Sequence, residues 1–124
     1  MMLQRLLKKL FPVRSWIAWT PIRTGWTDVG GPTVTARYCQ FGNVVFFQIK
    51  VVPGTTVATT AGTSYVSLPV AAGASGIGGD GSMVNTTALL AIGAVAFDVA
   101  NSRCYVPTQA ATTATLEIAG WFES

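Results

Sequence analysis

The residues able to carry chemistry are few in this sequence. Histidine is absent, which removes histidine-based acid–base catalysis, histidine metal ligation and every serine–histidine or cysteine–histidine nucleophile. Two cysteines, Cys39 and Cys104, cannot form a four-ligand zinc site alone. The sequence therefore points away from most enzyme classes, and we expect a protein without catalytic activity, cofactor, metal or small-molecule substrate.

Carboxylates are the remaining candidates for catalysis, and the chain has five acidic residues. If Asp98 and Glu117 lay on facing strands, they could form the carboxylate pair of a glycosidase. Such an enzyme would also need aromatic side chains in a groove to bind the sugar. Asp28 and Asp80 lie in glycine-rich segments, where aspartate commonly serves turn geometry. No D-x-D-x-D-G cluster indicates calcium. Scattered surface carboxylates are the simpler interpretation.

The segment 76–81, Gly-Ile-Gly-Gly-Asp-Gly, matches the string G-x-G-x-x-G. Dinucleotide binding needs that string between a strand and a helix, whose N-terminus holds the pyrophosphate. Alanine, glycine and serine surround this copy, and no helical pattern follows it. We therefore expect residues 71–82 to form a surface loop that could contact a receptor or a neighbouring subunit through Ser75, Ile77, Asp80 and Ser82.

The charges are few and unevenly placed. Residues 1–23 carry five basic residues and no acid, whereas residues 24–124 carry three basic and five acidic residues, for a net charge of +3. Charged residues make up 10% of the chain, against roughly 25% in an average domain. A surface so poor in charge is expected where copies of the chain or a partner cover it. We therefore expect an oligomer.

Residues 2–10 have the pattern of a short amphipathic helix. Four leucines recur at helical spacing along one side, basic residues occupy the other, and Pro12 ends the pattern. The leucine stripe could pack on its own domain, dock in a groove of another protein, or lie on a membrane surface. No stretch is long enough to span a membrane, since residues 88–100 fall short of about 20 apolar residues. No signal peptide is recognisable, so we expect synthesis in a reducing cytosol.

Residues 13–33 read as an extended arm that contains Trp16, Trp19 and Trp26. These tryptophans could anchor on a neighbouring subunit or close the ends of the domain's own core. With the basic residues they could also bind nucleic acid. The candidate partner-binding residues of the arm are Leu3, Arg5, Leu6, Leu7, Lys8, Lys9, Leu10, Phe11, Arg14, Trp16 and Trp19.

From residue 33 the pattern becomes that of β-strands. Alternating or apolar runs predict strands over 34–40, 44–52, 64–68, 88–99, 103–106 and 113–123, with a turn at Gly42–Asn43. We expect an all-β, antiparallel, jelly-roll-like sandwich over residues 26–124, preceded by a helical anchor and linker arm over residues 1–25. In a reducing cytosol Cys39 and Cys104 are expected to be buried free thiols, with a disulfide as the alternative.

Three segments carry a family resemblance. They are Arg-Tyr-Cys-Gln-Phe-Gly-Asn-Val-Val-Phe-Phe-Gln-Ile at 37–49, Gly-Thr at 62–63 with Ser-Leu-Pro at 67–69, and Leu-Glu-Ile-Ala-Gly-Trp-Phe at 116–122. Together they resemble small β-domains of tailed-bacteriophage virions, which occur at tail-fibre tips and as head-fibre or capsid decoration proteins. The resemblance covers roughly residues 26–124.

The resemblance implies a homotrimeric, non-enzymatic structural protein of the virion, on the outer capsid surface or the tail. A short arm before the body favours a capsid decoration (cement) or head-fibre subunit over a tail-fibre tip, which normally follows shaft repeats. The body would oligomerise, and the arm would dock on the major capsid protein. The alternative is a tail-fibre, adaptor or receptor-binding tip module that recognises a glycan or protein on the host surface.

Overall fold

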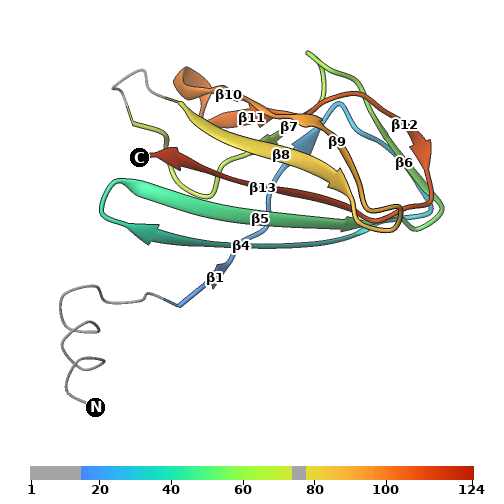
Figure 1. Ribbon diagram of the computed structural model, residues 1–124, viewed down its shortest axis with the longest axis horizontal. Helices are drawn as coiled ribbons and strands as arrows, with labels where there is room; N and C mark the ends of the chain where they lie inside the picture. Colours follow the sequence, from blue (N-terminus) through green and yellow to red (C-terminus); the bar gives the residue numbers. More distant parts are fainter. Residues whose placement is uncertain (1–14, 74–77) are drawn as a thin grey trace.

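The computed structural model describes residues 15–73 and 78–124 (Figure 1). In these ranges the chain forms short and long β-strands and one turn of 3-10 helix, η1 (Val99–Asn101), and all strand pairs are antiparallel. The predicted all-β, antiparallel class is confirmed. Across the same ranges, no helix is long and apolar enough to cross a membrane.

The largest sheet has six strands and places the last strand of the chain near its middle. Its long hairpin turns at Gly42, whose φ of +55° suits glycine. The final strand then pairs with the hairpin on one side and with a strand from the middle of the chain on the other. The order is β1 (Ile17–Ala18), β4 (Thr33–Phe41), β5 (Val44–Val52), β13 (Leu116–Glu123), β8 (Gly79–Asn85) and β9 (Leu90–Ala94).

Two smaller sheets complete the fold. A four-stranded sheet has the order β10 (Ala96–Asp98), β11 (Arg103–Tyr105), β7 (Tyr65–Ser67) and β2 (Arg23–Thr24). A three-stranded sheet has the order β12 (Gln109–Thr112), β6 (Thr56–Thr59) and β3 (Thr27–Val29). Strands β1, β2 and β3 show that residues 17–29 of the expected arm join all three sheets.

The core draws its side chains from the six-stranded sheet and from both smaller sheets. In β5 every second residue is buried, because successive side chains of a strand point to opposite faces. Phe47 is 1% exposed, and its ring lies about 6 Å from the rings of Trp19, Phe97 and Phe122. The buried apolar cluster contains Val45, Phe47, Ile49, Val51, Val57, Val66, Leu68, Met83, Val95, Cys104, Val106, Leu116, Ile118 and Phe122.

The structure corrects the expected element boundaries at two places. The loop expected over residues 71–82 is too long, because β8 already begins at Gly79 and pairs with both β13 and β9. The single strand expected over residues 88–99 is two strands, since the chain leaves the six-stranded sheet near Val95 and enters the four-stranded sheet as β10. The helix expected over residues 2–10 lies outside the described residues.

Candidate binding site

The outward face of the six-stranded sheet carries aromatic side chains where a solvated face would carry polar ones. In β5, Phe46 lies out of phase with the buried residues and is 42% exposed. In β13, Trp121 lies out of phase with the buried Phe122 and is 36% exposed. Trp16, just before β1, is 42% exposed. Large apolar side chains gathered on one surface commonly mark a binding site.

Strand register brings these residues into one row. Phe46 is the cross-strand partner of Trp121 on one side and of Cys39 on the other. Trp121 in turn pairs with Asp80 of β8. The pairing of β1 with β4, continued by one residue, places Trp16 beside Cys39.

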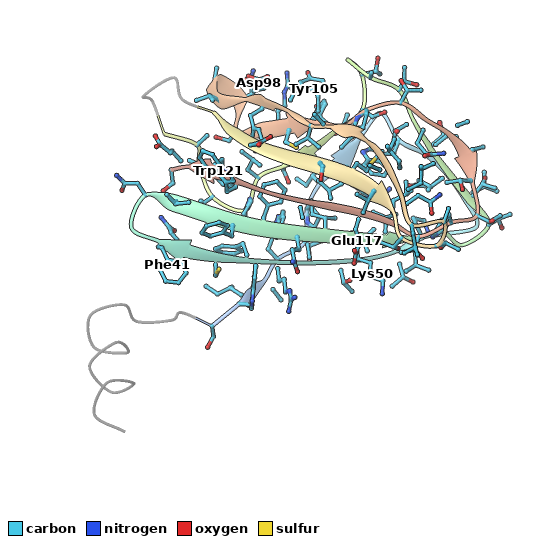
Figure 2. The ribbon with its side chains drawn as sticks, viewed as in Figure 1. Phe41, Lys50, Asp98, Tyr105, Glu117 and Trp121 are labelled. Atoms are coloured by element: carbon cyan, nitrogen blue, oxygen red, sulfur yellow. The ribbon has the colours of Figure 1, made fainter. Side chains whose placement is uncertain are left out.

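Around this row the surface is hollowed, with a volume of about 700 Å³. That volume falls inside the range of about 300–1,000 Å³ typical of small-ligand sites. Figure 2 shows Trp121 near the end of the sheet where Phe41 and the β4–β5 turn lie. We call this surface the outer hollow; it is lined by Trp16, Cys39, Phe46, Phe47, Gln48, Asp80, Gly81, Ser82, Ala119, Gly120 and Trp121.

The floor of the outer hollow is low because small residues meet across β8 and β13. Ser82 pairs with Ala119, and both small side chains face outward; Gly81 pairs with Gly120 at positions in phase with the buried Met83 and Phe122, where the two backbones approach closely. A Cβ on Gly120 would collide with the backbone carbonyl of Asp80, so only glycine allows the two strands to approach this closely. The rings of Phe46 and Trp121 therefore stand beside a shallow floor.

Polar side chains line the outer hollow between the rings. The Arg37 Nε donates to Gln48 Oε1 at 2.9 Å, which fixes the amide of Gln48, and the guanidinium lies 4.6 Å from the centre of the Trp16 ring. The Asp80 Oδ1 accepts from the backbone N–H of Gly81 at 2.9 Å. Among the hydrogen bonds of the described residues, none engages Gln48 Nε2, Asp80 Oδ2 or the hydroxyl of Ser82.

The site residues expected from the sequence divide into three groups. Trp16, Asp80 and Ser82 line the outer hollow together. Trp19 instead packs on the core of its own chain, edge-on to Tyr38 at 6.1 Å, with its indole N–H buried and without a hydrogen-bond partner. The others lie outside the described residues: Leu3, Arg5, Leu6, Leu7, Lys8, Lys9, Leu10, Phe11, Arg14, Ser75 and Ile77.

Sequence reasoning missed Phe46, Gln48 and Trp121. The available signal was phase, since Phe46 lies between the apolar Val45 and Phe47, and Trp121 directly precedes Phe122. That signal marks an outward side chain but does not show that the two side chains are neighbours. Phe46 and Trp121 become neighbours only because β5 pairs with β13, a strand far from β5 in the sequence.

A second cluster lies on the outer face of the four-stranded sheet, where Asp98 and Tyr105 are labelled in Figure 2. Arg103 donates from Nε to Asp98 Oδ2 at 2.9 Å, and its guanidinium lies 4.4 Å from the Tyr65 ring centre and 5.4 Å from that of Tyr105. These groups satisfy one another by charge, hydrogen bonding and cation–π contact. The cluster therefore holds β7, β10 and β11 together, and we call these four residues, Tyr65, Asp98, Arg103 and Tyr105, the clasp.

The carboxylates considered for glycosidase chemistry are not neighbours. Asp98 ends β10 of the four-stranded sheet, whereas Glu117 belongs to β13 of the six-stranded sheet and pairs with Lys50. Figure 2 shows Asp98 and Glu117 well apart. Within the described ranges no group of three or more acidic, cysteine or histidine side chains could hold a metal ion.

The clasp gives a pH prediction. A hydrogen bond from Asn101, and then the guanidinium of Arg103, hold the pKa of Asp98 below its ordinary value of 3.8. A carboxyl whose pKa is lower when folded stabilises the fold above its ordinary pKa, and this contribution is lost as the pH falls through the folded value. We expect the free energy of unfolding to decrease as the pH falls below about 4, and less steeply in Asp98→Asn.

Urea unfolding at a series of pH values measures this slope in both proteins, and a carbon-13 NMR titration of the Asp98 carboxyl gives its pKa directly. A pKa at or above 3.8, or equal slopes in the two proteins, would contradict the prediction.

Both cysteines are buried and free, as the sequence led us to expect. Burial raises the pKa of the Cys104 thiol to about 12, so the reactive thiolate is scarce at pH 8. Cys39 differs because it lies on the outward face, beside Trp16 and Phe46 in the outer hollow.

We therefore expect Trp16→Ala to uncover Cys39. Its labelling by a disulfide reagent at pH 8 should become at least about tenfold faster, because reactivity follows exposure, while Cys104 stays unlabelled. Mass spectrometry of the labelled peptides separates the two thiols, and Trp16→Phe, which keeps an aromatic cover, is the control. Equal labelling rates in the wild type and Trp16→Ala would show that Trp16 does not cover Cys39.

Comparison of the chain with protein-family models, with curated proteins and with solved structures finds no match.

Proposed function

We propose that this chain is a non-enzymatic structural subunit of a virus particle, and that it works by attachment through the outer hollow. The observation that carries the proposal is the exposure of Trp16, Phe46 and Trp121 on one sheet face. Aromatic side chains dominate the energetics of interfaces because each buries a large apolar area. A domain that acted alone would gain nothing from leaving three of them in water.

The virion assignment comes from the resemblance of residues 26–124 to phage decoration and head-fibre domains. In this proposal residues 1–14 hold the subunit on the major capsid protein, and the outer hollow of the β-body attaches to a second partner. The three sheets around one shared core support, as part of the same proposal, a jelly-roll-like sandwich.

Self-association also belongs to the proposal, because the chain has so few charges to keep copies apart. Sedimentation equilibrium of the purified chain should give three times its mass of 13.0 kDa. A species with the mass of one chain at micromolar concentration would remove the trimer from the proposal.

The alternative is a receptor-binding tip module, and one observation favours it. Asp80 and Ser82, which we expected to contact a receptor or a neighbouring subunit, both line the outer hollow. The two functions predict different numbers of copies of the chain per particle, because a decoration protein occupies a repeating lattice and a tip module occupies one tail.

Counting copies of the chain against the major coat protein in purified particles, by quantitative mass spectrometry, tests the proposed function. Hundreds of copies at a fixed ratio to coat protein would support decoration. A few to a few tens would support the tip module. Complete absence from the particles would overturn both virion functions.

A further inference from the structure

Two kinds of side chain face the outer hollow, and together they narrow what it can bind. The rings of Trp16, Phe46 and Trp121 offer flat apolar faces. Gln48, Asp80 and Ser82 offer hydrogen-bonding groups among those rings. A purely apolar partner would leave these polar groups without partners, which is costly once water is excluded.

The polar groups of the outer hollow also suit a ligand that both donates and accepts hydrogen bonds. Because Arg37 already occupies Gln48 Oε1, the amide nitrogen of Gln48 is left as a donor. Asp80 keeps one carboxylate oxygen as an acceptor, since only Oδ1 accepts from Gly81. The Ser82 hydroxyl can serve either way. Hydroxyl groups on a ligand satisfy all three.

The charge of the residues that line the outer hollow also restricts the net charge of a ligand. Among the described residues that line the outer hollow, Asp80 is the one that carries a charge, so an anionic ligand would meet repulsion there. The guanidinium of Arg37 lies over the Trp16 ring, and its Nε already donates to Gln48. A neutral ligand is therefore favoured over a phosphate, a nucleic acid or an acidic sugar.

A pyranose combines these properties, because its ring presents C–H groups on its faces and hydroxyls around its edge. We propose that the outer hollow binds a neutral saccharide of one or two pyranose rings. In this arrangement Trp121 stacks on a ring face, with Phe46 beside it, while Gln48, Asp80 and Ser82 form hydrogen bonds with the hydroxyls. The inference rests on the proposed function, since it names the partner class of the same attachment surface.

The four tryptophans of the chain provide the test. In nitrogen-15 NMR spectra of the full chain each indole N–H gives its own signal, and four neutral disaccharides serve as probes: cellobiose, maltose, lactose and N,N′-diacetylchitobiose. We expect at least one of them to shift the signals of Trp16 and Trp121 saturably. The signals of Trp19, packed on the core, and of Trp26, whose indole donates to the Tyr65 carbonyl at 3.2 Å, should stay in place.

Two variants separate binding at the outer hollow from binding elsewhere. Trp121→Ala should raise the dissociation constant for the disaccharide by at least about tenfold, because it removes a stacking face. Val52→Ala is the matched control: Val52 is 39% exposed on the same face of β5 as Phe46 but lies outside the outer hollow. It should bind as the wild type does.

No shift with any of the four disaccharides would overturn the inference, as would equal affinity in Trp121→Ala or shifts centred on Trp26. The proposed function is judged separately, by whether attachment to host cells depends on Phe46 and Trp121. If the disaccharides fail while that dependence holds, the attachment function stands with a protein partner and the saccharide inference falls.

Discussion

Replacing Phe47 by alanine is expected to lower the free energy of unfolding by about 3–5 kcal/mol, which is the usual cost of deleting a buried phenylalanine ring. Phe47 lies in β5 at the centre of the core and is 1% exposed. Its ring lies within 6.4 Å of three other aromatic rings, those of Trp19, Phe97 and Phe122. These belong to three separate segments, so the cavity would open where the segments meet.

Chemical denaturation by urea, followed by tryptophan fluorescence, measures the loss. Phe46→Ala is the matched control, because Phe46 is the next residue of the same strand but points outward; its cost should be about 1 kcal/mol or less. If Phe47→Ala does not fold, Phe47→Leu keeps most of the volume and should cost about 1.5 kcal/mol or less. Similar losses in Phe47→Ala and Phe46→Ala would contradict the placement of the core.

The second large effect is expected at Gly79, the first residue of β8. A Cβ there would overlap the backbone carbonyl of Trp121 and lie 2.8 Å from the Cα of Phe122. Backbone atoms cannot move aside as a flexible side chain can, so β8 would have to separate from β13. We expect Gly79→Ala to cost about 1–3 kcal/mol or more, as overpacking of a well-fitted site does.

Thermal unfolding of Gly79→Ala, followed by circular dichroism, checks this. Its neighbour Gly78 is the control, because a Cβ there meets the side chain of Phe97 at 3.3 Å and no backbone atom. Gly78→Ala should stay within about 1 kcal/mol of the wild type. Equal melting temperatures for Gly79→Ala and the wild type would mean that β8 and β13 do not approach as closely as described.

The strands that could be predicted from the sequence are those whose alternation is strong. The β4–β5 hairpin has a clear turn signal at Gly42–Asn43, and β5 was predicted at its observed bounds. Strands β6 and β12 were missed because each is four residues of threonine, alanine, valine or glutamine, too short and too weakly apolar to show a period. The start of β8 was missed because glycines there read as loop, although they serve close strand approach.

The outer hollow could be predicted only in pieces. Trp16, Asp80 and Ser82 were candidates, but for separate reasons and on separate segments. Their convergence requires β13 to lie between β5 and β8, which is a property of the topology and not of any local pattern. The glycosidase pair failed for the same physical reason, since Asp98 and Glu117 fell in different sheets.

The central claim is that the outer hollow is the attachment surface of this chain. It is tested most directly by the binding of the fluorescently labelled chain to cells of the host, with the Phe46→Ala/Trp121→Ala double variant beside the wild type. We expect the double variant to lose at least about tenfold in affinity for the surface that the wild type binds, and Val52→Ala to lose nothing. Undiminished binding by the folded double variant would contradict the claim.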